Sequence, residues 1–163
     1  MKFLFLLLSL LSLQAHASWV SIKEAGSVVE KFHSDYEVYK NGSWSETIEY
    51  VLRVQSEDSK VNASLFPIEY NGFTDQVEIL EAYTQNGKEK IPVDPANIED
   101  RDKGESKDYD VQKVRSVVFP RVEIGSKLHM RYRIKTTKPL IEDRWSTEVS
   151  VFPSFHMESF RLN

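Results

Sequence analysis

The amino-acid sequence predicts an all-β protein, an antiparallel β-sandwich of immunoglobulin-like type, from three observations. Apolar and charged residues alternate strictly from Leu128 to Lys135, which is the period of a strand with one buried face. Asn41-Gly42 and Asn86-Gly87 are dipeptides typical of β-hairpin turns. Several short strand patterns are separated by Pro and Gly, and no long helix is indicated.

A β-hairpin is the clearest local feature, with strands predicted over 36–40 and 43–55. The Asn41-Gly42 pair between them accepts the positive φ angles that a type I′ turn requires. One face of the second strand is apolar and is interrupted only by Glu46; it comprises Trp44, Ile48, Tyr50, Leu52 and Val54. This strand is therefore expected to have one buried and one solvated side.

The following region is predicted to be partly irregular. A polar turn is expected over 56–60, and a loop with apolar anchors over 65–73. A strand is predicted over 76–85, and Asn86-Gly87 turns it into another over 88–93. The inward side chains of the first of these strands are expected to be Val77, Ile79 and Tyr83.

The C-terminal part begins with an almost wholly polar stretch, 94–110, which predicts a mobile surface loop. Two strands follow within 114–135, and two short strands are expected over 146–152 and 157–162. Because the alternation of the last strand still runs at Asn163, we expect a module that is truncated at its C-terminus, with no partner strand for this end.

The N-terminus predicts export. Lys2, the apolar run over 3–13 and Ala15-His16-Ala17 form a signal peptide over 1–17, with cleavage between Ala17 and Ser18. Residues 18–27 are predicted to be a linker or a short helical turn, and 28–163 to form one β-sandwich domain. The mature protein is expected in the periplasm or secreted, and not spanning a membrane.

Composition excludes several classes of function. Because 21 Lys and Arg stand against 25 Asp and Glu, there is no basic excess for nucleic-acid binding. The absence of cysteine excludes thiol catalysis, Cys-ligated zinc and a lipoprotein anchor. His33, His129 and His156 are far apart in the sequence, and no metal or cofactor site is predicted.

Several short motifs carry a family resemblance. They are Glu81-Ala82-Tyr83-Thr84, Asn86-Gly87-Lys88, Ile91-Pro92-Val93 and, most specifically, Phe119-Pro120-Arg121-Val122-Glu123-Ile124-Gly125. Together with the alternating strand after the last one, they resemble the uncharacterised exported bacterial domain, domain of unknown function 3857, that precedes transglutaminase-like domains. The resemblance implies a papain-like neighbour with a Cys-His-Asp triad. That triad has no counterpart in this chain, so no catalytic residue is carried over.

Two residue sets are candidates for binding. The basic stripe His129, Arg131, Arg133 and Lys135 could dock an acidic partner, or it could be the solvated side of an antiparallel sheet. The second set is aromatic and could stack on sugars, anchor an interface or pack in the core; its members are Trp145, Phe152, Phe155 and Phe160.

The leading hypothesis is an exported, non-catalytic module that supports or positions a transglutaminase-like or peptidase-like partner. The alternative is an envelope module that binds carbohydrate or peptidoglycan, and a third is a hydrolase whose catalytic groups come together only in the fold. An aromatic row exposed on one sheet face would favour sugar binding. A contiguous apolar patch near the C-terminus would favour a domain that is missing from this chain.

Overall fold

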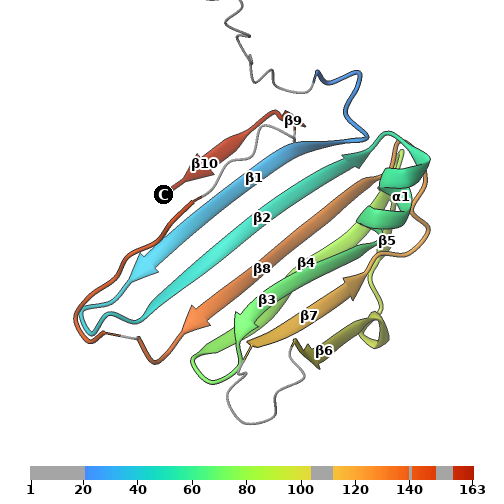
Figure 1. Ribbon diagram of the computed structural model, residues 1–163. Helices are drawn as coiled ribbons and strands as arrows, with labels where there is room; N and C mark the ends of the chain where they lie inside the picture. The colour runs from blue at the N-terminus through green and yellow to red at the C-terminus, as the bar shows by residue number, and fades with distance from the viewer. Residues whose placement is uncertain (1–20, 104–111, 140, 150–155) are drawn as a thin grey trace, which may run out of the picture.

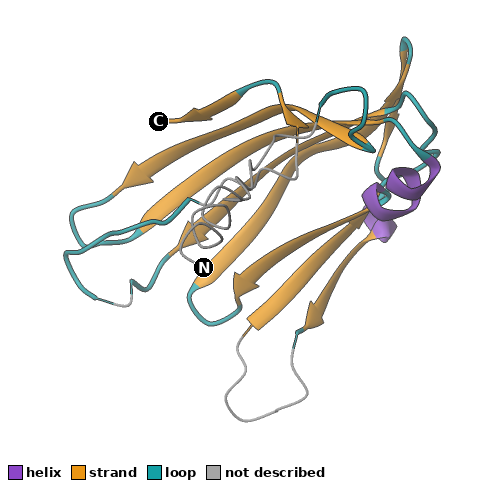
Figure 2. Ribbon diagram, turned by 45° about the horizontal axis from the view of Figure 1, so that its top comes forward, coloured by secondary structure: helices purple, strands orange, loops and turns teal. Residues whose placement is uncertain are grey.

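Two β-sheets packed face to face form the protein, as Figures 1 and 2 show, so the predicted β-sandwich is confirmed. The computed structural model describes residues 21–103, 112–139, 141–149 and 156–163. The seven-stranded sheet has the order β10-β1-β2-β8-β4-β5 with β9 also beside β1, and the three-stranded sheet has the order β3-β7-β6. The strands are β1 (Ser27–Val38), β2 (Trp44–Val54), β3 (Leu65–Asn71), β4 (Asp75–Asn86), β5 (Glu89–Pro92), β6 (Ile98–Asp102), β7 (Gln112–Val118), β8 (Lys127–Thr136), β9 (His156–Met157) and β10 (Phe160–Leu162).

The predicted hairpin is formed by β1 and β2, but its turn is not of type I′. Among the described residues of this turn only Gly42 has a positive φ, of 80°. Tyr39 donates its N–H to the carbonyl of Ser43, and Gly42 donates to the carbonyl of Tyr39. The Asn41 side chain also accepts from the Ser43 N–H at 3.1 Å. The turn is therefore longer than two residues, with glycine at its one left-handed position.

A β-bulge in β4 explains why one predicted orientation is wrong. Val77 and Ile79 pack against the core as predicted, but the register against β8 shifts between Ile79 and Glu81. The extra residue reverses every later side chain, since successive side chains in a strand alternate between faces. Tyr83 consequently lies on the outer face, where its ring stacks on that of His129.

Three segments predicted as turns or loops are regular elements instead. The predicted turn over 56–60 opens α1 (Glu57–Ala63), because Ser56 caps it by accepting from the Ser59 N–H. The predicted loops over 65–73 and 94–110 contain β3 and β6, which pair with the two edges of β7. A 3₁₀ turn at Pro95–Asn97 leads into β6. Residues 104–111 lie outside the described part of the chain.

The C-terminal end has a partner, which corrects the expectation of an unpaired strand. β9 and β10 both run parallel to β1 along its outer edge. Asn163 donates its N–H to the carbonyl of Ser34, and Tyr36 donates to the carbonyl of Asn163, each at 3.0 Å. Of the strand predicted over 146–152, residues 146–149 form no regular element and 150–152 lie outside the described residues.

The core lies between the two sheets and confirms the predicted buried face of β8. Leu128, Met130 and Tyr132 are buried there. They pack with the other members of the cluster, which are Ile48, Val54, Ile68, Val117, Phe119 and Val122. With no cysteine in the chain, apolar burial is the main favourable contribution to the stability of the fold.

Candidate functional site

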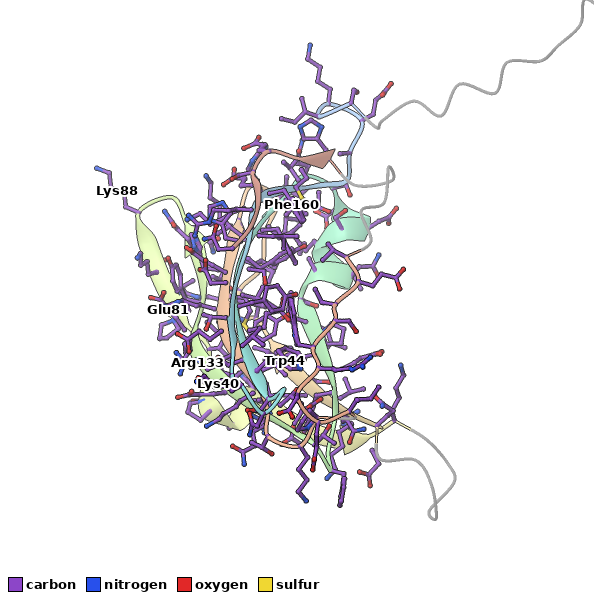
Figure 3. The ribbon with its side chains drawn as sticks, turned by 90° about the vertical axis from the view of Figure 1, so that its left-hand side faces the viewer. Lys40, Trp44, Glu81, Lys88, Arg133 and Phe160 are labelled. Atoms are coloured by element: carbon purple, nitrogen blue, oxygen red, sulfur yellow. The ribbon has the colours of Figure 1, made fainter. Side chains whose placement is uncertain are left out.

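The small sheet covers only part of the large one. In Figure 1 it lies in front of β4 and β5, while β10, β1, β2 and β8 extend beyond its edge. Figure 3 shows Phe160 and Trp44 on the same side of the large sheet as α1, and Arg133 and Glu81 on the opposite side. The inner side of β10, β1 and β2 is thus only partly enclosed by the sandwich.

Aromatic rings run in contact across this inner side. Phe160 of β10 stacks on Phe32 of β1, with centroids 5.7 Å apart. Phe32 meets Tyr50 of β2 edge to face at 6.3 Å, and Tyr50 meets Phe66 of β3 at 5.3 Å. We call this surface the open face; it comprises Phe32, Tyr50, Leu52, Phe66, Phe160 and Leu162. The side chains of Phe160 and Leu162 are 42% and 40% exposed, so part of this apolar surface is open to solvent.

An apolar cleft of about 330 Å³ opens where the open face meets the small sheet. Its lining is almost wholly apolar and consists of Tyr50, Leu52, Asn62, Ala63, Leu65, Phe66, Pro67, Phe119 and Leu128. Burial raises the pKa of the Tyr50 hydroxyl to about 12. A cleft of this composition can accept an apolar side chain from another surface.

A carboxylate interrupts the apolar side of β2, as the sequence indicated at Glu46. Ser34, which is fully buried on β1, donates its hydroxyl to Glu46 at 2.6 Å. Burial is the largest cause of a raised pKa at the neighbouring Tyr36, whose hydroxyl also meets Thr147. The Tyr36 ring contacts that of Trp145 at 5.4 Å. The polar interruption therefore lies where residues 141–149 cross the inner side of the hairpin.

A second and larger cavity, of about 650 Å³, lies beside this crossing. Trp44 and Trp145 both line it, together with side chains from the β3–β4 turn and from the segment after β8. The crossing is tight, because a Cβ on Gly42 would lie 2.9 Å from the Arg144 carbonyl oxygen. Sequence reasoning assigned Trp44 only to the buried face of its strand and missed this cavity, which residues distant in the sequence enclose.

The predicted basic stripe lies on the outer face of β8, where it is flanked by acidic residues. Arg131 is registered between Glu49 of β2 and Glu81 of β4. Arg133 approaches Glu78 at 3.4 Å. Lys135 is registered between Ser45 and Gln76. Arg131 and Arg133 therefore lie on a mixed-charge surface where acidic residues partly compensate their charge, whereas Lys135 has uncharged neighbours in register.

His129 forms a stack at one end of that stripe. Its ring lies 4.3 Å from the ring of Tyr83, over which the Lys90 ammonium sits at 4.6 Å. Burial, followed by the Lys90 charge, lowers the pKa of His129 below its ordinary 6.5. The environment of the imidazole therefore favours its uncharged form.

The structure separates the members of the predicted aromatic set. Trp145 contacts Tyr36 at the hairpin end, whereas Phe160 contacts Phe32 within the open face. Phe152 and Phe155 lie outside the described residues, as do Ala17 and Ser18 at the predicted cleavage site.

The described residues contain neither a grouped set of metal ligands nor a helix suited to cross a bilayer. In residues 21–103, 112–139, 141–149 and 156–163, no three His, Asp or Glu side chains are grouped to hold a metal ion. Within the same ranges, no helix combines the length and the apolar character that crossing a bilayer requires.

Comparison with known proteins identifies a family and shows a similar fold in a solved structure. A family model described as a domain of unknown function with solved structure, DUF3857, matches residues 40–163. A solved structure from Parabacteroides distasonis, described as a "putative protease", superposes with a TM-score of 0.64 at 18% identity. The match covers 70% of this chain and 23% of that one, so it spans less than a quarter of that protein's length. No curated protein matches the sequence.

Proposed function

We propose that this chain, which belongs to the DUF3857 family, is an exported, non-catalytic module whose open face holds a transglutaminase-like or peptidase-like partner domain. The observation that carries this proposal is the continuous apolar surface from Phe160 on β10 to the cleft beside Phe66. A contiguous apolar patch of this kind near the C-terminal strand is typical of protein interfaces.

The solved protein from Parabacteroides distasonis supports the choice of partner. It is described as a "putative protease", and the part that resembles this chain is under a quarter of its length. A domain with this fold therefore occurs in that protein together with more than three quarters of additional chain. By analogy, the partner of the present module is a peptidase-like or transglutaminase-like domain, and its docking surface carries an apolar side chain that fills the cleft.

Site-specific photocrosslinking in the native cell envelope tests this proposal. A benzophenone side chain would be placed at Leu52 in the cleft or Leu162 at the rim. We expect both positions to yield a covalent adduct with one polypeptide that mass spectrometry assigns to a papain-like peptidase or transglutaminase fold. The adduct should disappear when an excess of unlabelled module competes for the partner.

Two further positions serve as controls. The benzophenone group at Lys88, on the β4–β5 turn, should give no specific adduct. The same group at Arg131 tests whether the basic stripe contacts a partner. Adducts formed at Arg131 but not at Leu52 or Leu162 would move the interface to the outer face. Adducts with unrelated polypeptides at every position would contradict the proposal.

Export and the absence of catalysis are separate parts of the proposal. Cleavage after Ala17 gives a mature N-terminus of Ser-Trp-Val-Ser, which sequencing of the envelope fraction checks directly; retention of Met1 would contradict export. Because the chain has no cysteine, it cannot form an acyl-thioenzyme, and transglutaminase and thiol-peptidase assays of the purified module should show no turnover. Turnover abolished by a single Ser, Asp or Glu substitution would make the module an enzyme.

A further inference from the structure

The larger cavity lies at the opposite end of the hairpin from the cleft of the open face. Its walls come from three places that are distant in the sequence: the start of β2, the β3–β4 turn, and the segment that follows β8. A volume of about 650 Å³ is within the range of pockets that bind small ligands. The proposed docking of a partner does not use it.

Two tryptophans give the cavity an aromatic wall. Trp44 and Trp145 flank Tyr36, whose ring centroid lies 6.1 Å from that of Trp44 and 5.4 Å from that of Trp145. In the described part of the chain, neither indole N–H donates a hydrogen bond to the protein. Each indole thus offers an apolar face with a free donor at its edge, which is the combination that binds the C–H faces and hydroxyls of sugars.

The charge available in the cavity is positive. Arg144 lines it and, within the described residues, forms no ion pair. Asp75 also lines it, but its carboxylate already accepts from the Asn71 N–H, the Thr74 hydroxyl and the Thr136 hydroxyl at 2.7–3.0 Å. Lys138 lies with its ammonium over the Phe73 ring at 4.1 Å. An unpaired guanidinium beside a satisfied carboxylate favours an anionic ligand, and a guanidinium matches a carboxylate in particular.

The geometry points to a binding site for an oligosaccharide that carries a carboxylate, with the indoles of Trp44 and Trp145 against the sugar rings and Arg144 on the acid group. The Tyr36 ring is inclined by 48° to that of Trp44 and by 59° to that of Trp145, so Tyr36 forms no parallel pair of rings with either indole. This argues against a flat nucleobase held between Tyr36 and an indole, and so favours a sugar.

Nuclear magnetic resonance of the full mature chain tests this assignment through its three tryptophans. Trigalacturonate and the N-acetylglucosamine–N-acetylmuramic acid disaccharide are the acidic probes, and the methyl ester of trigalacturonate is the neutral one. We expect the indole N–H signals of Trp44 and Trp145 to shift saturably with an acidic probe at millimolar concentration.

Substitutions separate the roles of the aromatic wall and of the cation. Trp145→Ala should abolish saturable binding. Arg144→Gln should weaken binding of the acidic probe about tenfold, as loss of a charge-assisted hydrogen bond predicts, and leave binding of the methyl ester unchanged. Arg101→Gln on β6, a surface arginine outside the cavity, is the matched control and should have no effect.

Three results would overturn the proposal. The first is that neither acidic saccharide shifts the two indole signals saturably. The second is that the methyl ester binds as tightly as the acid. The third is that adenosine monophosphate binds more tightly than either saccharide. Because the partner contacts the open face and the ligand contacts this cavity, Leu162→Asp should remove docking without changing the saccharide titration. The two proposals therefore fail independently.

Discussion

The rings of Phe32 and Phe160 stack with their planes only 12° apart, although the two residues belong to the first strand and the last. Their Cα atoms are partners in the parallel pairing of β1 with β10. The C-terminal end of the chain is thereby fixed to the N-terminal strand, and the same pair of rings begins the open face. The contact between Phe32 and Phe160 therefore both stabilises the edge of the sheet and forms part of the proposed docking surface.

Replacement of Phe160 should destabilise this edge. Phe160→Ala removes both the stacking and the apolar area shared with Phe32, and we expect the free energy of unfolding to fall by about 1–2 kcal/mol. Leu162→Ala, which has similar exposure but no ring partner, should cost less than half as much. Urea denaturation followed by circular dichroism measures both. Equal costs would mean that the ring contact contributes nothing beyond burial.

Glycine 42 should be far less replaceable than the glycine of the other hairpin. Both Gly42 and Gly87 have positive φ, so each alanine substitution costs about 1–2 kcal/mol in backbone conformation. Only at Gly42 would the new Cβ also meet the Arg144 carbonyl oxygen, at 2.9 Å, whereas nothing lies within 4 Å at Gly87. Gly42→Ala should therefore lower the melting temperature more than Gly87→Ala and change the fluorescence of Trp145. Identical melting temperatures would contradict the tight crossing.

The hydroxyl of Ser34 should contribute more to the free energy of unfolding when Glu46 is present than when it is replaced. Ser34→Ala removes the hydroxyl that donates to the Glu46 carboxylate at 2.6 Å and should cost about 1–3 kcal/mol. In a Glu46→Leu background the same change should cost less than about 0.5 kcal/mol, which a double-mutant cycle measures. Thr84→Val is the control, because the buried Thr84 hydroxyl has no partner among the described residues and its loss should be nearly neutral. Equal costs of Ser34→Ala in the two backgrounds would exclude coupling.

The ion pair between β6 and β7 should make stability depend on pH. The Arg115 Nε donates to Asp100 Oδ1 at 2.8 Å, and this hydrogen bond is the main cause that lowers the pKa of Asp100 below its ordinary 3.8. The unfolded state therefore binds this proton more tightly, so the stabilisation is complete above the unfolded pKa and is lost as pH falls through the folded pKa.

Asp100→Asn should reduce the loss of stability between about pH 5 and pH 2, and Asp102→Asn, whose side chain is 77% exposed, should leave the profile unchanged. Urea titrations at a series of pH values provide the comparison. A profile for Asp100→Asn that parallels that of the unsubstituted protein would show that the ion pair is screened by solvent.

The amino-acid sequence by itself determined the sandwich class, the strand alternation of β2 and β8, and the family. These features are local, since side-chain period and turn residues are read within ten or so positions. Even Glu46 was recognisable as an interruption of an apolar face. The basic stripe of β8 was equally visible as a pattern, but the acidic residues that flank it lie on strands whose register the sequence did not specify.

Tertiary structure decided the rest. β6 is polar along most of its length and is a strand because β7 offers it backbone hydrogen bonds, which no local pattern encodes. The bulge in β4 reverses Tyr83, and the parallel return of β10 joins Phe160 to Phe32. The open face and the larger cavity, which Trp44 and Trp145 line, exist only because these distant segments meet. Pairing and packing between segments far apart in sequence are set by the global free energy of the fold, so no window along the chain contains them.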